Sequence, residues 1–227
     1  MDADGDSGAE ETAGLFVDPP GFYAPTVPAR TISYTRASGE VLTLQLPPQH
    51  SLLCLDGLSV AELGAGAGLP SLLAATTARA VVTTDYPDAP LLAALAANAA
   101  AVPTTAPITV VGLRWGDAPA AAALVDEHGP FDVVLMADLV SNHGAHAKLL
   151  STLEVLVGGP TGGGVGVVAY GHHRVACVDA DEAFFTTAAD AGWHVGGGAV
   201  IRCAPMFADD PGFGGCGGGY SAVRAGR

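Results

Sequence analysis

The sequence is short of positive charge. Only nine of its 227 residues are Lys or Arg, against 23 Asp and Glu, so the formal net charge is −14. A protein that binds nucleic acid needs a basic face to neutralise phosphates, so this balance argues against a nucleic-acid partner. Strong acidity can steer a basic partner toward the surface, although it can equally serve solubility alone.

Neither a secretory signal nor a membrane-spanning segment is expected. The chain begins MDADGDSGAEE, which is acidic where a secretory signal would be basic and then apolar. No apolar stretch is long enough to span a bilayer, so no membrane partner is expected. The four cysteines, which include no CxxC pair, are expected to be reduced thiols in a cytoplasmic protein.

Aromatic residues are scarce, although about half of the chain is apolar. The expected core is therefore aliphatic and belongs to a globular protein. Residues 1–13 are small and acidic and predict a disordered tail. Residues 14–57 predict a proline-rich arm followed by a β-hairpin over 32–46, where ISYTR and EVLTLQL flank Ala-Ser-Gly. Residues 58–227 form the expected main domain.

Short apolar strands alternate with helices in this main domain. The pattern predicts an α/β fold whose mostly parallel sheet is covered by helices on both faces. The expected strands cover 58–63, 80–85, 108–113, 131–138 and 164–170, with further strands near 194–202 and 219–223, and the expected helices cover 69–78, 88–103, 118–128, 144–157 and 179–191. Right-handed crossovers place the carboxyl ends of the parallel strands at one edge, where open sheets bind ligands.

A glycine run follows the first strand of this domain. Gly64, Gly66 and Gly68 allow a tight turn and a close approach of backbone to ligand. Leu69 stands where a dinucleotide fingerprint has its last glycine. Glu62 would repel a pyrophosphate but suits a cationic amino-acid ligand. A purely structural turn is the alternative interpretation.

Three candidate site residues stand at or just after the carboxyl ends of the following three expected strands. Asp85 is placed to accept hydrogen bonds from both hydroxyls of a ribose, unless it caps the next helix, a role that Asp88 can take instead. Trp115 can pack on an adenine ring or belong to the core. Asp138 can orient a substrate amine or cap a helix.

Histidines gather near the later strand ends. His143 and His146 form an HxxH motif, and His172 is followed by His173. No third ligand has recognisable metal spacing, so no metal site is predicted. The His172–His173 pair also fits a place in a substrate pocket.

The motifs together resemble class I S-adenosylmethionine-dependent methyltransferases. VAELGAGAGLPS, TTDYPD, LRWGD and ADLVSNHGAHAKLL are similar to the lysine-methyltransferase-like group, and within it to fungal enzymes that methylate the N-terminus and a nearby lysine of translation elongation factor 1A. The resemblance implies a monomeric protein methyltransferase with a Rossmann-like seven-stranded sheet whose last strand is antiparallel. It implies a role for Asp138, Asn142 and His143 in catalysis, and cofactor contacts at Glu62, Gly64, Ala65, Gly66, Asp85, Tyr86, Trp115 and Ala137.

Two departures from the family pattern keep alternatives open. The family places a tryptophan-containing helix, which covers the cofactor, between the hairpin and the first motif strand, but here only PPQHSLLCLDG joins them. Ser141 stands where the family has an aromatic residue. The alternatives are a small-molecule N-methyltransferase, nicotinamide-like in substrate, and a non-catalytic protein that lacks the covering helix.

Overall fold

The structure of the chain is a computed structural model that describes residues 30–35, 41–46, 55–159, 162–172, 174–201 and 218–224. The chain divides into two compact units, residues 1–53 and 54–227. The predicted acidic tail, most of the predicted arm and the short linker before Leu55 lie outside the described residues. The sequence also predicts a glycine-rich loop from Gly212 to Gly219, of which residues 212–217 lie outside the described residues, whereas Gly218 and Gly219 belong to a strand.

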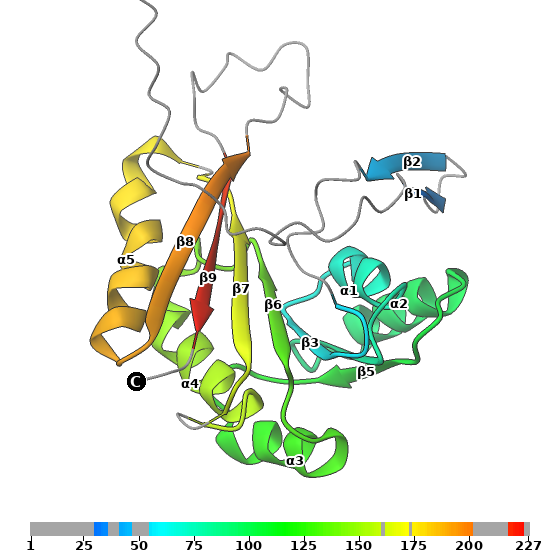
Figure 1. Ribbon diagram of the computed structural model, residues 1–227, viewed down its shortest axis with the longest axis horizontal. Coiled ribbons are helices and arrows are strands. Elements are labelled where there is room, and N and C mark those ends of the chain that lie inside the picture. The colour runs from blue at the N-terminus through cyan, green and yellow to red at the C-terminus, as the bar shows by residue number, and fades with distance from the viewer. Residues whose placement is uncertain are drawn as a thin grey trace, which may run out of the picture. The chain divides into compact units, whose positions relative to one another are not determined.

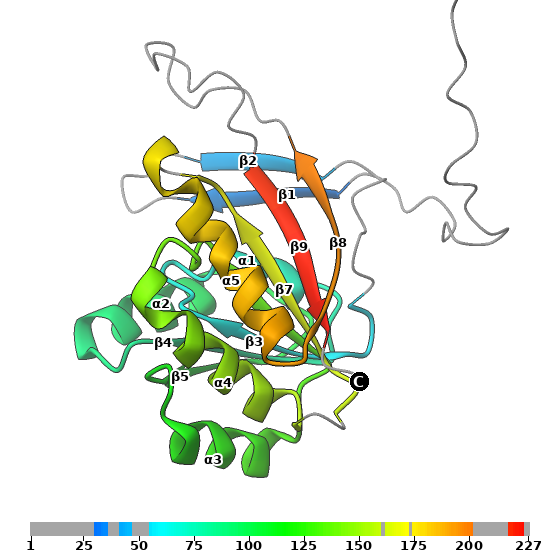
Figure 2. The same ribbon diagram turned by 90° about the vertical axis from the view of Figure 1, so that its left-hand side faces the viewer.

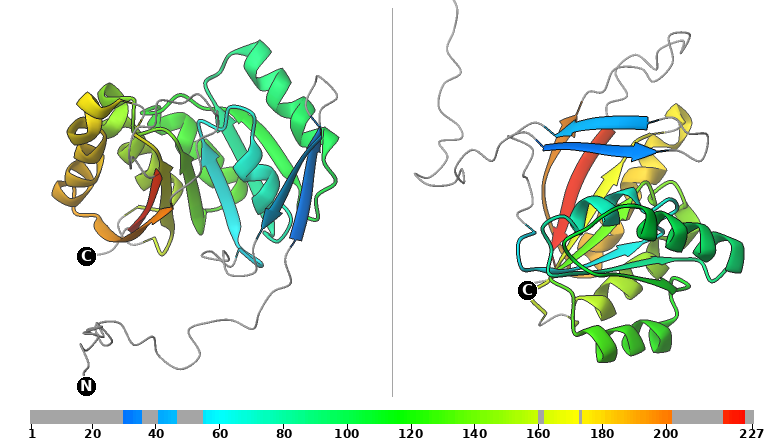
Figure 3. Two further views of the ribbon diagram at one scale, coloured as in Figure 1. Left: turned by 90° about the horizontal axis from the view of Figure 1, so that it is seen from above. Right: turned by 90° about the vertical axis from the view of Figure 1, so that its right-hand side faces the viewer.

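The first unit contains the predicted hairpin. Strands β1 (Arg30–Thr35) and β2 (Val41–Leu46) pair antiparallel, with Thr35 opposite Val41 and Arg30 opposite Leu46. They are the two blue arrows of Figure 3. This antiparallel pairing agrees with the hairpin predicted over 32–46, although β1 begins two residues earlier, at Arg30.

The second unit is built on a twisted sheet (Figure 1) with the strand order β5-β4-β3-β6-β7-β9-β8. Strands β5, β4, β3, β6 and β7 are parallel, and β9 pairs antiparallel with both β7 and β8. The α/β Rossmann-like fold with a parallel sheet is thus confirmed. The strands are β3 (Ser59–Leu63), β4 (Ala80–Asp85), β5 (Ile108–Gly112), β6 (Val133–Ala137), β7 (Val165–Tyr170), β8 (His194–Ile201) and β9 (Gly218–Arg224).

Helices cover both faces of this sheet (Figure 2). One face carries α1 (Leu69–Ala74) and α2 (Ala89–Ala101), and the other carries α3 (Ala118–His128), α4 (His146–Leu156) and α5 (Val178–Asp190). Each face has its own apolar cluster, and the neighbours Val60 and Ala61 on β3 belong to different clusters. The central strand β3 is buried along its whole length, as expected for a parallel sheet covered on both sides.

Local side-chain capping marks where two of the helices, α2 and α3, begin. The side chain of Asp88 accepts a hydrogen bond from the Leu91 N–H at the start of α2, and Asp117 does the same for Ala120 in α3. Each helix also has a proline in its first turn, where the missing N–H costs nothing. Because Asp88 caps α2, the carboxylate of Asp85 is not needed for that purpose.

The first helix is shorter than the predicted range of 69–78. Helix α1 ends at Ala74, and turns follow it. The hydroxyl of Thr76 donates to the Leu73 carbonyl, and the hydroxyl of Thr105 reaches the carbonyls of Ala75 and Thr76. These bonds offer the backbone an alternative to further helical turns, which explains the early end.

Candidate functional site

All predicted site residues lie at, or just after, the carboxyl ends of β3, β4, β5 and β6. These ends meet at one edge of the sheet because the four strands are parallel. The short 3₁₀ helix η1 (His143–Ala145) follows β6, and a second one, η2 (Val175–Cys177), follows β7. The edge is therefore formed by loops, which is where α/β proteins place ligands.

The glycine loop after β3 requires glycine at particular positions. Gly64, Gly66 and Gly68 all have left-handed backbone angles, with φ of 62°, 54° and 80°. A Cβ at Gly64 would lie 2.7 Å from Leu139 Cδ2 and 2.8 Å from Trp115 Cζ2, whereas a Cβ at Gly66 would meet no atom of the described residues within 4 Å. Gly64 therefore serves packing, and the backbone of Gly66 borders open space.

Glu62, in β3 just before the glycine loop, bonds to the helix that follows the loop. Its side chain is buried, and one carboxylate oxygen accepts hydrogen bonds from the N–H of Ser71 at 2.9 Å and from the Ser71 hydroxyl. Burial raises the pKa of Glu62 to about 7, although the bonds from Ser71 favour the ionised form. The structure thus turns the Glu62 carboxylate toward α1, and its predicted contact with the cofactor stays a prediction.

The raised pKa of Glu62 predicts a pH-dependent stability. The folded protein holds this proton more tightly than the unfolded chain, where the pKa is near 4.5, so ionisation destabilises the fold as the pH rises toward and past 7. Relative to a Glu62→Gln variant, which cannot ionise, the free energy of unfolding of the wild-type protein should fall by about 2 kcal/mol between about pH 5.5 and about pH 8.5. Denaturant unfolding of both proteins at the two pH values measures this.

A matched substitution controls for the loss of an acid. Glu154 lies on α4 with its side chain exposed to solvent. Glu154→Gln should therefore keep a constant difference from the wild-type protein over the same pH range. A constant difference for Glu62→Gln as well would show that Glu62 does not titrate in this window.

Asp85 ends β4 and binds the glycine loop directly. Its Oδ2 accepts a hydrogen bond from the Gly66 N–H at 2.6 Å, and its Oδ1 accepts one from the Tyr86 N–H at 2.6 Å. Tyr86 is about half exposed, and Arg114 donates to its hydroxyl at 3.0 Å with the guanidinium over the ring. An acidic group therefore lies beside the open loop, next to an exposed aromatic ring.

Trp115 and Ala137 also lie at this edge. Trp115 is partly buried and packs against the apolar cluster on the face of α3 to α5, so part of its ring belongs to the core. Its Cζ2 is also close to the glycine loop, because it is among the atoms nearest to a Cβ built at Gly64. Ala137 is the last residue of β6 and pairs with Ala169 of β7.

The segment after β6 begins with an unusual backbone conformation. Asp138 has φ of 61°, and within the described ranges no other residue except glycine has a positive φ. Its N–H donates to the Ala169 carbonyl at 2.7 Å, and its side chain is exposed. Asn142 is also exposed, and its carbonyl accepts from the Ala145 N–H. Strained, exposed residues in ordered loops are typical of functional sites.

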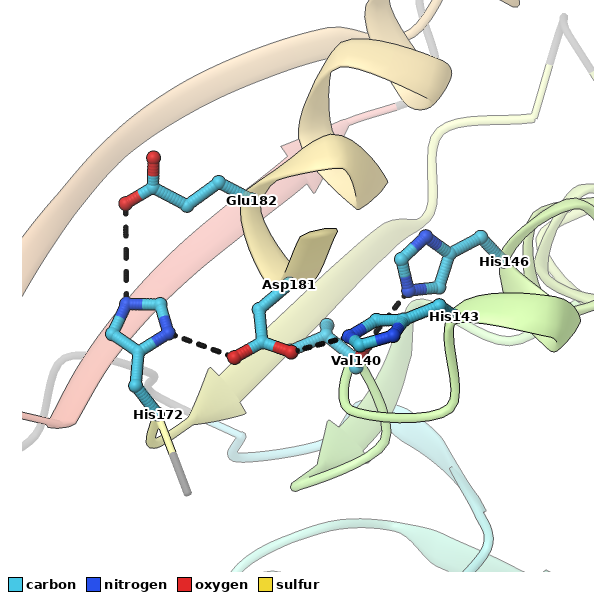
Figure 4. Close-up of polar contacts among 6 residues, drawn as sticks. All are labelled: Val140, His143, His146, His172, Asp181 and Glu182. Carbon is cyan, nitrogen blue, oxygen red and sulfur yellow. Dashed lines mark hydrogen bonds and ion pairs between the residues drawn. The ribbon is translucent and has the colours of Figure 1, made fainter. Parts of the chain in front are cut away.

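Sequence reasoning missed an acidic residue that joins two of the histidines. Asp181 on α5 accepts a hydrogen bond from His143 Nε2 at 2.7 Å and another from His172 Nδ1 at 2.9 Å (Figure 4). Asp181 is 1% exposed. It lies 38 positions from His143 in sequence, and acids in a first helical turn are common, so spacing alone gave no signal.

The two histidines of the HxxH motif bond to different partners. His146 is buried, and its Nε2 donates to the Val140 carbonyl at 2.7 Å, whereas His143 bonds to Asp181. His173 lies outside the described residues. Over the ranges that the structure describes, no three His, Cys, Asp or Glu side chains converge as metal ligands would.

In the described part of the chain, none of the helices combines the length and the apolar character that crossing a bilayer requires.

The residues at the strand edge fit an adenosyl ligand. The open backbone at Gly66 allows close approach, and the Asp85 carboxylate beside it retains lone pairs that can accept from hydroxyls. The half-exposed ring of Tyr86 offers an aromatic surface at the same edge.

Comparison with known proteins agrees with this geometry. A family described as lysine methyltransferase matches residues 42–191. A Schizosaccharomyces pombe protein named protein N-terminal and lysine N-methyltransferase efm7 is 33% identical over 89% of this chain and 90% of its own length. A Neurospora crassa protein of the same name is 33% identical over 91% of this chain and 86% of its own length.

Solved structures share the fold. The magnesium protoporphyrin IX methyltransferase of Synechocystis PCC 6803, solved with bound SAH, superimposes with a TM-score of 0.51 at 16% identity, over 75% of each chain. The family match covers most of the chain and includes the glycine loop, Asp85 and the segment after β6. The chain therefore belongs to the lysine methyltransferase family.

Proposed function

We propose that this protein transfers methyl groups from S-adenosylmethionine to amino groups of a protein, namely an N-terminal α-amine and a lysine near it. The observation that carries the proposal is the site itself: the open glycine loop, Asp85 and the segment from Asp138 to His143 meet at one sheet edge, in a chain of the lysine methyltransferase family. The names of the relatives from Schizosaccharomyces pombe and Neurospora crassa support the choice of amine.

S-adenosylmethionine is the methyl donor, and when bound it supplies an electrophilic methyl group on a sulfonium. The chain's own residues would hold it: the backbone of Gly64, Ala65 and Gly66 by close approach, and Asp85 through the ribose hydroxyls. Tyr86 and Trp115 would border the adenine, and Ala137 would offer a main-chain contact. We also propose that the sheet of the second unit has seven strands and that its last strand, β9, is antiparallel. The pairing of β9 with β7 and β8 supports this.

Methyl transfer to an amine needs alignment and a free lone pair more than covalent chemistry. Asp138 lies exposed at the start of the segment after β6, where its negative charge can attract the ammonium form of the substrate. The net charge of −14 favours a basic protein as the substrate. We propose translation elongation factor 1A, methylated in the cytoplasm by a monomeric enzyme, as the resemblance implies.

Transfer of labelled methyl groups tests this function. The purified protein is incubated with labelled S-adenosylmethionine and an extract of cells that lack the gene, and products are separated by mass. We expect one labelled protein band at the mass of elongation factor 1A, with methyl groups on its N-terminal amine or a lysine by mass spectrometry. Label only in small molecules would favour the nicotinamide-like alternative, and no binding of S-adenosylmethionine in calorimetry would favour a non-catalytic protein.

Asp138→Asn tests the role of the charge in this assay. Asparagine tolerates a left-handed backbone about as well as aspartate, so the variant removes the charge while keeping the conformation at φ of 61°. We expect turnover to fall by about tenfold, the effect of losing about 1.4 kcal/mol of attraction for the ammonium group. Unchanged turnover would show that Asp138 does not attract the substrate.

A further inference from the structure

One cluster at the sheet edge has a geometry that methyl-donor binding does not use. His143 follows β6, His172 follows β7, and Asp181 on α5 lies between them, with one carboxylate oxygen bonded to each ring (Figure 4). We call His143, Asp181 and His172 the histidine cluster. It joins two loops of the ligand-binding edge through a buried carboxylate.

The charge state of Asp181 fixes the hydrogen positions on both rings. Burial raises the pKa of the Asp181 carboxyl, but the hydrogen bonds from His172 and His143 more than compensate, so the pKa lies below its ordinary value of 3.8. The ionised carboxylate has no hydrogen to donate. Nε2 of His143 and Nδ1 of His172 must therefore each carry a hydrogen, which leaves the lone pair of a neutral His143 on Nδ1.

The two histidines differ in their access to solvent. The side chain of His143 is 32% exposed, whereas that of His172 is 13% exposed and has Glu182 Oε1 at 3.9 Å from its Nε2. The second ring nitrogen of His143 points away from Asp181 (Figure 4). His143 is thus the member of the cluster that can meet a substrate.

The other titratable groups around His143 do not compete for this role. His146 on α4 lies edge-on to the His143 ring, with 5.8 Å between the ring centroids, and its own Nε2 is bonded to the Val140 carbonyl. On α5, Asp181 bonds to both rings, and Glu182 lies nearer to His172. The ring of Tyr170 on β7 lies edge-on to His172, with 5.5 Å between the ring centroids.

We propose that His143 accepts the proton that the substrate ammonium must lose before methylation, and that Asp181 and His172 are positioning residues that hold its ring in the required tautomer. This inference rests on the proposed function. In the step, an N–H bond of the ammonium breaks, a new N–H bond forms at His143 Nδ1, and the electron pair stays on the amine nitrogen. The imidazolium is stabilised by the Asp181 carboxylate and passes the proton to water.

Whether the reaction needs a proton acceptor such as His143 depends on the pH. An α-amine has a reference pKa of about 7.7–8.0 and a lysine of about 10.4, so near neutral pH most of the substrate carries the extra proton. At high pH the amine loses this proton to water unaided. Loss of a proton acceptor should therefore slow the reaction near neutral pH and matter less as the pH rises, whereas loss of a structural support would slow it at every pH.

The test compares kcat against pH for the wild-type protein, His143→Gln and Asp181→Asn, with recombinant elongation factor 1A as the methyl acceptor. We expect both variants to be about tenfold slower near neutral pH and to approach the wild-type rate in alkaline buffer. Asp190→Asn, which removes an exposed carboxylate at the far end of α5, should match the wild-type protein throughout. A deficit that is constant with pH, or no deficit in His143→Gln, overturns the proposal.

A second measurement needs no substrate. Nitrogen-15 NMR of the histidine rings distinguishes the two neutral tautomers, and we expect hydrogen on Nε2 of His143 and on Nδ1 of His172 in the wild-type protein. In Asp181→Asn the preference at His143 should weaken or reverse, because an amide can also donate. The opposite tautomer of His143 in the wild-type protein would overturn the inference.

The two proposals can fail separately. If the wild-type protein transfers no methyl group to elongation factor 1A, the proposed function fails and this inference falls with it. If the wild-type protein is active and His143→Gln is equally active near neutral pH, the function stands and only the role of the histidine cluster is wrong.

Discussion

Replacing Asp85 by alanine should weaken the binding of S-adenosylmethionine by about a hundredfold. The carboxylate accepts hydrogen bonds from Gly66 N–H and Tyr86 N–H, both at 2.6 Å, and has further lone pairs for ribose hydroxyls. Hydrogen bonds to a charged group contribute about 1.5–3 kcal/mol each, and about 2.7 kcal/mol corresponds to the expected hundredfold loss. Calorimetric titration of the folded variant with S-adenosylmethionine measures the change.

A nearby acid provides the control. Asp88→Asn removes the same charge three positions later, and asparagine caps a helix as well as aspartate does, so α2 should remain intact. This variant should bind S-adenosylmethionine within about twofold of the wild-type protein, because general electrostatics contribute little at an exposed position. Equal losses in both variants would mean that Asp85 acts through overall charge and not through contact with the ribose.

The fold could be predicted from the sequence wherever local signals decide it. Short apolar runs predicted the strands β3 to β7, and Asp88 with Pro90 marked the start of α2, because capping is a local interaction. The predicted end of α1 was wrong partly because Thr105, distant in sequence, bonds to the carbonyls of Ala75 and Thr76. A window of sequence around α1 contains Thr76 but not Thr105.

The same distinction applies to the candidate site. Gly64 and Gly66 lie just after β3 and Asp85 ends β4, so the parallel topology alone predicts that they meet. The partner of His143 could not be predicted in this way, because Asp181 reaches it from another helix. The role of Glu62 as a partner of Ser71 was also missed: an acid before a glycine loop indicates a ligand contact unless the packing of α1 is known.

Gly66→Ala should abolish tight binding of S-adenosylmethionine while leaving the fold intact. Within the described part of the chain, the added methyl group would meet no atom closer than 4 Å, so the cost to stability is that of a left-handed alanine, about 1 kcal/mol. The same methyl group would occupy the space that the backbone leaves open for the ligand. We expect binding to weaken by about a hundredfold or more, the cost of about 2.7 kcal/mol when a contact is replaced by a clash.

Gly64→Ala should instead lower the stability of the fold more than the affinity for S-adenosylmethionine. The two variants together therefore distinguish packing from ligand contact. Its Cβ would lie 2.7 Å from Leu139 and 2.8 Å from Trp115. Leu139 belongs to the apolar cluster on the face of α3 to α5 and Trp115 packs against that cluster, so neither side chain can move without disturbing the core. Left-handed strain and overpacking together should cost about 3 kcal/mol of folding free energy. Thermal unfolding and calorimetric titration of both variants separate the two effects: stable Gly66→Ala protein that binds S-adenosylmethionine normally would show that the cofactor does not contact this loop.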